Sequence, residues 1–146
     1  MQIICLGDSI TDCNHLFEDF PLGNGYVQML SEIFKKETSF NNVQIKNYGN
    51  NVQIKNYGFD GFTVARVLDN IRQHRISLHR SPVVTLLIGI NDIGLMMNTD
   101  RTPAQQEEMM GSFQEHYLEL LTILTKSSCS VILMEPFVFS CPAFSS

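Results

Sequence analysis

The chain has 146 residues, of which 44% are hydrophobic and 17% are charged, and its formal net charge is -5. This length suits one soluble globular domain, so we expect residues 1–146 to share a single core. An acidic chain without a run of lysine or arginine offers no surface for nucleic acid or an anionic membrane. We therefore expect neither as a partner.

The first twelve residues, MQIICLGDSITD, contain an apolar run of only four residues and no basic stretch. Such a run is too short for a signal peptide or a membrane span, so we expect a cytoplasmic protein without a membrane-spanning segment. The cysteines lack the spacing of a zinc site and are expected to be reduced thiols. They are Cys5, Cys13, Cys129 and Cys141. The sequence therefore predicts no metal and no cofactor.

In the first half of the chain, the apolar run QIICL at residues 2–6 predicts a strand that is buried on both faces. Apolar residues at helical spacing predict a helix over residues 25–36. The alternating VQIK at residues 52–55 predicts a second strand, and Thr63 can cap a helix that begins at residue 64.

In the second half, the run VVTLLI at residues 83–88 predicts a third strand. Thr102 and Pro103 are typical of a helix start, and an amphipathic helix should run from there to about Lys126. SVILM at residues 130–134 predicts a fourth strand. Strands that alternate with helices indicate the α/β class, because parallel neighbours need long crossover connections.

The nine residues NNVQIKNYG occur twice, at 41–49 and again at 50–58. Both copies have the strand pattern, so strand propensity does not distinguish them. Only the second copy is followed by Gly61 and Thr63, a loop that leads into a helix. We therefore expect the second copy to be the second strand, and the first to be an insertion that forms an edge hairpin or stays loose.

Three unusual loops follow the first three predicted strands, and the carboxyl ends of parallel strands meet at one edge of a sheet, where sites form. Ser9 is either a nucleophile or the N-cap of a helical turn. Gly61 either presents its backbone N–H to a ligand or is a loop glycine with positive φ. Asn91 either donates its side-chain amide to an oxyanion or is a turn residue.

The segments GDSITD, NYGFDGFT and GIND, in this order on these elements, resemble the SGNH hydrolases, or GDSL esterase/lipase family. The resemblance implies a flavodoxin-like three-layer α/β/α sandwich with a parallel sheet. It also implies hydrolysis of a small ester through an acyl-enzyme on Ser9. The backbone N–H groups of Ser9 and Gly61 and the side chain of Asn91 would then form the oxyanion hole, with Asp8 in a supporting role.

The family's fourth segment, an Asp and a His in a D-x-x-H pattern after a fifth strand, is not found after the fourth predicted strand. We therefore expect a C-terminally truncated domain that lacks the last strand and helix. Without that base Ser9 is a weak nucleophile, so we expect impaired activity. An unpaired fourth strand would also leave a sheet edge open to self-association.

Any of the four histidines could in principle replace the missing base. His74 and His79 precede the third strand, which places them at the opposite edge from Ser9. His116 should lie on the solvated side or at the margin of the long helix. His15, six residues after Ser9, is the one histidine expected at the correct edge.

Two readings from other classes stay open. The same pocket can hold a small ligand without turning it over, as a non-catalytic binding module. Alternatively, the carboxylates of Asp8, Asp60 and Asp92, which follow the three strands, can form a Mg²⁺ site for phosphoryl transfer. The chain lacks the glycine-rich phosphate loop that would favour the second alternative.

Overall fold

The computed structural model describes residues 2–40, 52–78, 83–98, 100–127 and 130–136. Four strands form one sheet in the order β2-β1-β3-β4, and every described pair of neighbours is parallel. The strands are β1 (Gln2–Gly7), β2 (Gln53–Gly58), β3 (Val83–Leu87) and β4 (Ser130–Leu133). The predicted α/β class and parallel sheet are confirmed.

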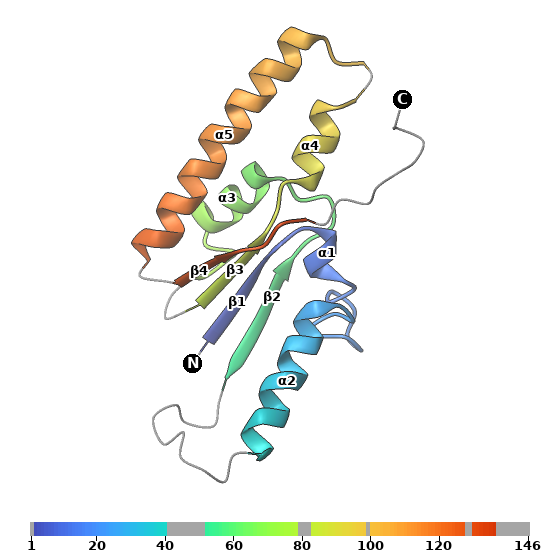
Figure 1. Cartoon of the computed structure of the whole chain (residues 1–146), viewed down its shortest axis with the longest axis vertical. Coiled ribbons are helices and arrows are strands. Elements are labelled where there is room, and N and C mark those ends of the chain that lie inside the picture. The colour runs from blue at the N-terminus through green and yellow to red at the C-terminus, as the bar shows by residue number, and fades with distance from the viewer. Residues whose placement is uncertain (1, 41–51, 79–82, 99, 128–129, 137–146) are drawn as a thin grey trace.

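Helices cover both faces of this sheet, which gives three layers (Figure 1). Helix α2 (Tyr26–Phe40) packs on one face, and α3 (Val64–Arg72) and α5 (Pro103–Lys126) pack on the other. Two short helices, α1 (Ser9–Asp12) and α4 (Ile90–Met96), begin just beyond the carboxyl ends of β1 and β3. Among the described helices, none is long and apolar enough to cross a membrane.

The central strand β1 explains why the first apolar run has no polar interruption. Ile4 and Leu6 are fully buried in the core that α3 and α5 cover. Ile3 and Cys5, which alternate with them, are buried against α2 on the other face. A strand covered on both faces must be apolar at every position, which is the pattern that the sequence shows.

The predicted helix starts are also confirmed. The Thr63 hydroxyl accepts a hydrogen bond from the backbone N–H of Arg66 at 3.4 Å. Thr102 forms a reciprocal capping box with Gln105, whose side chain accepts from the Thr102 N–H at 2.9 Å. Helix α4 was not predicted, because the residues after Gly89 were expected to form a loop. Gly89, with φ of 125°, turns the chain from β3 directly into this helix.

The second copy of the repeat is strand β2, as predicted, and pairs with β1 in the register Gln2↔Gln53 to Gly7↔Gly58. The first copy, residues 41–49, lies outside the described residues. At the other edge of the sheet, β4 has half-exposed side chains at Ile132 and Leu133. Self-association through this edge stays a prediction.

Candidate active site

The three loops that sequence analysis selected converge on one edge of the sheet. Strand β1 lies between β2 and β3, and all three run in the same direction. Ser9 therefore begins α1 just after β1, Gly61 follows β2, and Asn91 lies in the first turn of α4 after β3. The topology brings these three residues to the carboxyl edge of adjacent strands, where sites in parallel sheets form.

Asp8, not Ser9, is the N-cap of α1, so of the two roles considered for Ser9 the alternative of an N-cap is wrong. The buried Asp8 carboxylate accepts a hydrogen bond from the Ile10 N–H at 3.0 Å, whereas Ser9 is the first helical residue. The Ser9 side chain is exposed and lines a cavity of about 450 Å³. The other lining residues are Asp12, Cys13, Asn14, Leu16, Phe17 and Asp60. With its cap supplied by Asp8, the Ser9 hydroxyl is left free for a ligand.

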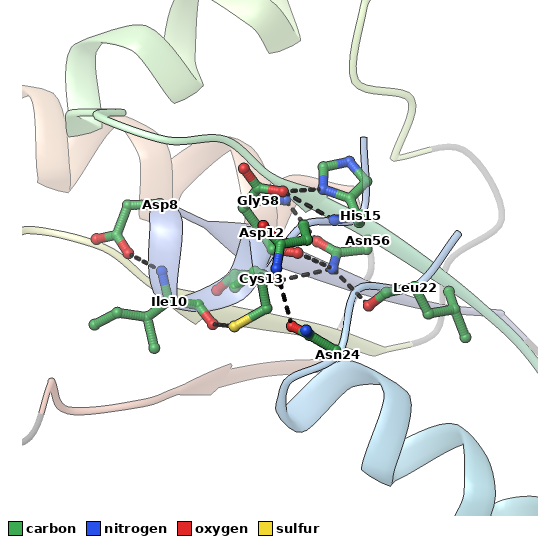
Figure 2. A network of polar contacts seen from close by, with 11 residues as sticks. Asp8, Ile10, Asp12, Cys13, His15, Leu22, Asn24, Asn56 and Gly58 are labelled. Atoms are coloured by element: carbon green, nitrogen blue, oxygen red, sulfur yellow. Dashed lines mark hydrogen bonds and ion pairs between the residues drawn. The ribbon is translucent and has the colours of Figure 1, made fainter. Parts of the chain in front are cut away.

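Asn56, which the sequence analysis did not select, fixes α1 to strand β2 (Figure 2). Its side-chain amide donates hydrogen bonds to the carbonyl oxygens of Thr11 at 2.7 Å and Leu22 at 2.9 Å. Its carbonyl oxygen accepts from the Gly58 N–H at 2.8 Å. These bonds satisfy a carbonyl near the end of α1 and a carbonyl in the following loop, which would otherwise be left without partners near the sheet.

Asp12 and His15 form a close pair beside this network (Figure 2). The His15 Nδ1 lies 2.7 Å from the Asp12 Oδ1, which also accepts from the His15 backbone N–H at 3.1 Å. The two residues have D-x-x-H spacing, although the family's pattern of this form follows a fifth strand, and they were therefore not predicted as a pair. The imidazole packs edge-on against Phe59, with ring centres 5.6 Å apart. In the described contacts, the pair anchors the loop after α1 and does not touch Ser9.

The loop that carries Gly61 is held from both sides. Gly61 has φ of 68°, a left-handed conformation that favours glycine. The Asn91 side-chain amide donates to the Phe62 carbonyl at 2.9 Å, and the Asp92 carboxylate accepts from the Val64 N–H at 3.2 Å. Because the Asn91 amide carries two hydrogens, one can hold the loop while the other faces a ligand oxygen.

Carboxylates crowd this edge. Burial raises the pKa of Asp8, and the charge of Asp60 raises it further, although the hydrogen bond from Ile10 opposes the shift. Burial likewise raises the pKa of Asp92. The hydrogen bond from Val64 and the nearby His116 lower this pKa, and the charge of Asp8 raises it by a smaller amount. Among the described residues, no group of three or more acidic, His or Cys side chains is arranged to hold a metal ion. The Mg²⁺ reading therefore gains no support.

The raised pKa of Asp8 makes a prediction about stability. A folded-state pKa above the unfolded value means that ionisation of Asp8 weakens the fold, so its unfavourable effect grows as the pH rises through that pKa. Asn at position 8 keeps the acceptor for Ile10 and removes the charge. We expect Asp8→Asn to raise the Tm by roughly 2 to 4 °C at pH 7 to 8, and this gain to vanish near pH 3.

Thermal unfolding followed by circular dichroism across this pH range measures the effect. Asp19→Asn, at an exposed loop position, is the matched control and should leave the Tm nearly unchanged. A gain in Tm for Asp8→Asn that is the same at pH 3 and pH 8 would show that the buried charge is not its cause.

The other histidines are placed as follows. His74 is exposed at the end of α3, where its φ is 57°, and His79 lies outside the described residues. His116 is half-buried and lines a cleft with Asp92, so its position matches the margin of α5 rather than the solvated side. In the described contacts, neither His74 nor His116 touches Ser9.

Solved structures share this fold. A single-substitution variant of Axe2, an acetyl xylan esterase from Geobacillus stearothermophilus, is 22% identical with a TM-score of 0.71; the match covers 93% of this chain and 60% of that one. Unsubstituted Axe2 is 23% identical with a TM-score of 0.70, and the match covers 93% of this chain and 59% of that one. LAE5, an alpha/beta hydrolase enzyme from the metagenome of Lake Arreo, Spain, is 23% identical with a TM-score of 0.62. That match covers 93% of this chain and 60% of LAE5.

The chain therefore spans about three fifths of the length of these solved proteins. At these identities the likeness establishes the fold. No curated protein matches the sequence. A family model, described as the GDSL-like Lipase/Acylhydrolase family, matches residues 5–144, which is nearly the whole chain. The match includes the Ser9 turn, the Gly61 loop and the start of α4. The chain belongs to the GDSL-like Lipase/Acylhydrolase family.

Proposed function

We propose that the chain is a serine esterase that hydrolyses a small ester through an acyl-enzyme on Ser9. The Ser9 Oγ attacks the ester carbonyl carbon and loses its proton, the bond to the alcohol oxygen breaks, and the alcohol leaves with that proton. Water then attacks the acyl group, releases the acid and restores the Ser9 hydroxyl. The single observation that carries this proposal is the position of Ser9: an exposed serine at the start of a helical turn whose cap is supplied by Asp8.

The oxyanion formed in each step needs donors that are already in place. We propose the backbone N–H groups of Ser9 and Gly61 and the second amide hydrogen of Asn91. Two facts support this assignment. Gly61 and Asn91 follow the strands on either side of β1, and the Asn91 amide is already hydrogen-bonded to the Gly61 loop through Phe62.

We further propose that hydrolysis is slow. A serine hydroxyl needs a base to become a strong nucleophile, and in the described contacts no histidine touches Ser9. A serine hydrolase without a complete triad keeps roughly 10³ to 10⁴-fold acceleration over water from binding and the oxyanion hole. Impaired turnover of this order is therefore the expectation for this chain.

A cytoplasmic location and the absence of nucleic-acid partners stay predictions.

The test is covalent labelling of the purified protein with a fluorophosphonate probe, together with hydrolysis of p-nitrophenyl acetate. We expect slow labelling that maps to the peptide containing Ser9, and a low hydrolysis rate that heat denaturation abolishes. Labelling of another residue would contradict the assignment. Absence of both labelling and hydrolysis, together with thermal stabilisation by a small ester, would instead favour the binding module.

A further inference from the structure

Helix α1 has only four residues, so its orientation depends on contacts with other elements. Within the turn, the Asp12 N–H donates to the Asp8 carbonyl at 2.9 Å, and the Cys13 N–H donates to the Ser9 carbonyl at 3.1 Å. These bonds hold the turn together, but they do not fix its rotation relative to the sheet. The direction in which Ser9 points must therefore be set by contacts between α1 and its neighbours.

Thr11 is the most deeply buried side chain of α1, with 1% of its surface exposed, whereas Ser9 is exposed. Successive residues of a helix are about 100° apart, so side chains two positions apart point about 200° apart. A buried Thr11 therefore directs Ser9 outward, away from the sheet. Any rotation of α1 that displaces the Thr11 side chain also turns Ser9.

Two glycines at the strand ends leave the space that the Thr11 side chain fills. Gly7 and Gly58 are paired neighbours at the ends of β1 and β2. A Cβ atom on Gly7 would overlap the Thr11 hydroxyl, and a Cβ atom on Gly58 would lie 2.7 Å from the Thr11 Cβ. The glycines thus place the Thr11 side chain in the core, where its hydroxyl needs a hydrogen-bond partner.

Tyr26, the first residue of α2, supplies this partner. Its hydroxyl oxygen lies 3.1 Å from the Thr11 Oγ1, and Figure 1 shows the start of α2 close to α1. The Tyr26 ring packs against the buried cluster of Ile3, Cys5 and Val27, which holds it in place. Burial raises the pKa of Tyr26, and the hydrogen bond with Thr11 opposes the shift only in part, so the hydroxyl keeps its proton at neutral pH.

We propose that Tyr26 is a positioning residue: its hydroxyl fixes the Thr11 side chain, and Thr11 fixes the rotation of α1 that points Ser9 at the ester. The inference rests on the esterase function proposed above. Tyr26 acts through Thr11 and does not touch the substrate, so loss of its hydroxyl should slow the covalent step and leave binding unchanged. A displacement of a reacting group by about 1 Å can slow a reaction by about a hundredfold.

Fluorophosphonate labelling at several probe concentrations separates the maximal labelling rate from the concentration that gives half of it. We expect Tyr26→Phe to lower the maximal rate by about tenfold and to leave the half-maximal concentration within about twofold. Tyr57→Phe is the matched control, because this half-buried tyrosine of β2 packs against the other core cluster. It should keep both values. A parental maximal rate in Tyr26→Phe, or a change in the half-maximal concentration alone, would overturn the proposal.

Two substitutions of Thr11 separate positioning from packing. Thr11→Val keeps the shape of the side chain but removes the hydroxyl and leaves that of Tyr26 unpaired, whereas Thr11→Ser keeps the hydroxyl and loses a buried methyl group. We expect Thr11→Ser to label nearly as fast as the parent and Thr11→Val as slowly as Tyr26→Phe. Combining Thr11→Val with Tyr26→Phe should slow labelling no further. Faster labelling of Thr11→Val than of Thr11→Ser would show that packing decides, and would overturn the proposal.

Hydrogen exchange separates this inference from the proposed function. If the parent is not labelled at Ser9, the esterase proposal fails, but the hold of Tyr26 on α1 can still be measured by NMR. We expect the amides of Asp12 and Cys13 to exchange at least about ten times faster in Tyr26→Phe, and the amide of Val67 in α3 to exchange at the parent rate. Unchanged exchange at Asp12 and Cys13 would overturn the role of Tyr26, whether or not Ser9 is labelled.

Discussion

Ser9→Ala is expected to abolish fluorophosphonate labelling and to remove the ester hydrolysis that passes through the acyl-enzyme, so that only the acceleration supplied by binding and the oxyanion hole remains. The reason is chemical: alanine has no oxygen that can form the acyl-enzyme, and the backbone donors alone do not provide a nucleophile. Because the Ser9 side chain is exposed and Asp8 supplies the cap of α1, the variant should fold normally. The measurement is kcat/KM on p-nitrophenyl acetate, together with fluorophosphonate labelling.

Ser77→Ala is the matched control, since Ser77 is an exposed serine outside the helices and strands. It should label and hydrolyse at the parent rate. The free energy of unfolding of both variants should stay within about 0.5 kcal/mol of the parent value, as is usual for exposed positions. Fluorophosphonate labelling that persists in Ser9→Ala would mean that another group is the nucleophile, and the acyl-enzyme assignment would then be wrong.

The sheet and its order of elements could be predicted from sequence because their causes are local. Residues 3–6 are all apolar because Ile3 and Ile4 face different helical layers. Thr63 and Thr102 indicate helix starts because their hydroxyl groups can cap a helix. The choice between the two repeat copies also came from a local signal, the loop after Gly58. Such features are visible without knowing the tertiary contacts.

The missed features depend on contacts between segments far apart in the chain. Asn56 appears in the sequence as one more polar residue near the end of a strand, and only the return of α1 and its loop over β2 brings the carbonyl oxygens of Thr11 and Leu22 to its amide. Helix α4 was missed because Asn91 and Asp92 are typical turn residues. In the structure their side chains bond to the chain around α3 instead.

The cap of α1 shows how local patterns mislead. Ser9 and Asp12 match the spacing of a capping box, which would make Ser9 the N-cap. In the structure the N-cap is Asp8, and Ser9 is the first residue of the helix. Asp12 is then free to pair with His15, whose role the sequence could not distinguish from that of an exposed loop histidine. The residues at the edge of the sheet could therefore be found from the sequence, while the role of Asp8 as a cap and of Asp12 and His15 as a pair required the fold.

Gly58→Ala is expected to have the largest effect on stability, because α1 lies directly against the ends of β1 and β2. A Cβ atom at Gly58 would come within 3.0 Å of backbone atoms of Thr11 and Asp12, where no flexible side chain can move aside. Either the turn shifts away from the sheet or the strand ends distort. We expect a loss of about 3 kcal/mol in the free energy of unfolding, at the upper end of the usual cost of overpacking.

The same change should alter the active site, which makes it informative about function. Any shift of α1 changes the position of Ser9, its first residue, and disturbs the hydrogen bond from the Gly58 N–H to Asn56. Fluorophosphonate labelling of the variant, measured where it is still folded, should therefore be slower than in the parent. Gly111→Ala, at an exposed site of α5 with no atom within 4 Å of the added Cβ, is the control.

Gly111→Ala should stabilise the protein by about 0.5 to 1 kcal/mol, since alanine is the better helix former, and should label at the parent rate. Opposite signs for two glycine-to-alanine changes would show that position, and not the loss of glycine, decides the outcome. Urea unfolding of both variants gives the free energies. If Gly58→Ala unfolds and labels like the parent, then close contact between α1 and β2 does not position Ser9, and the nucleophile must be oriented by Asp8 alone.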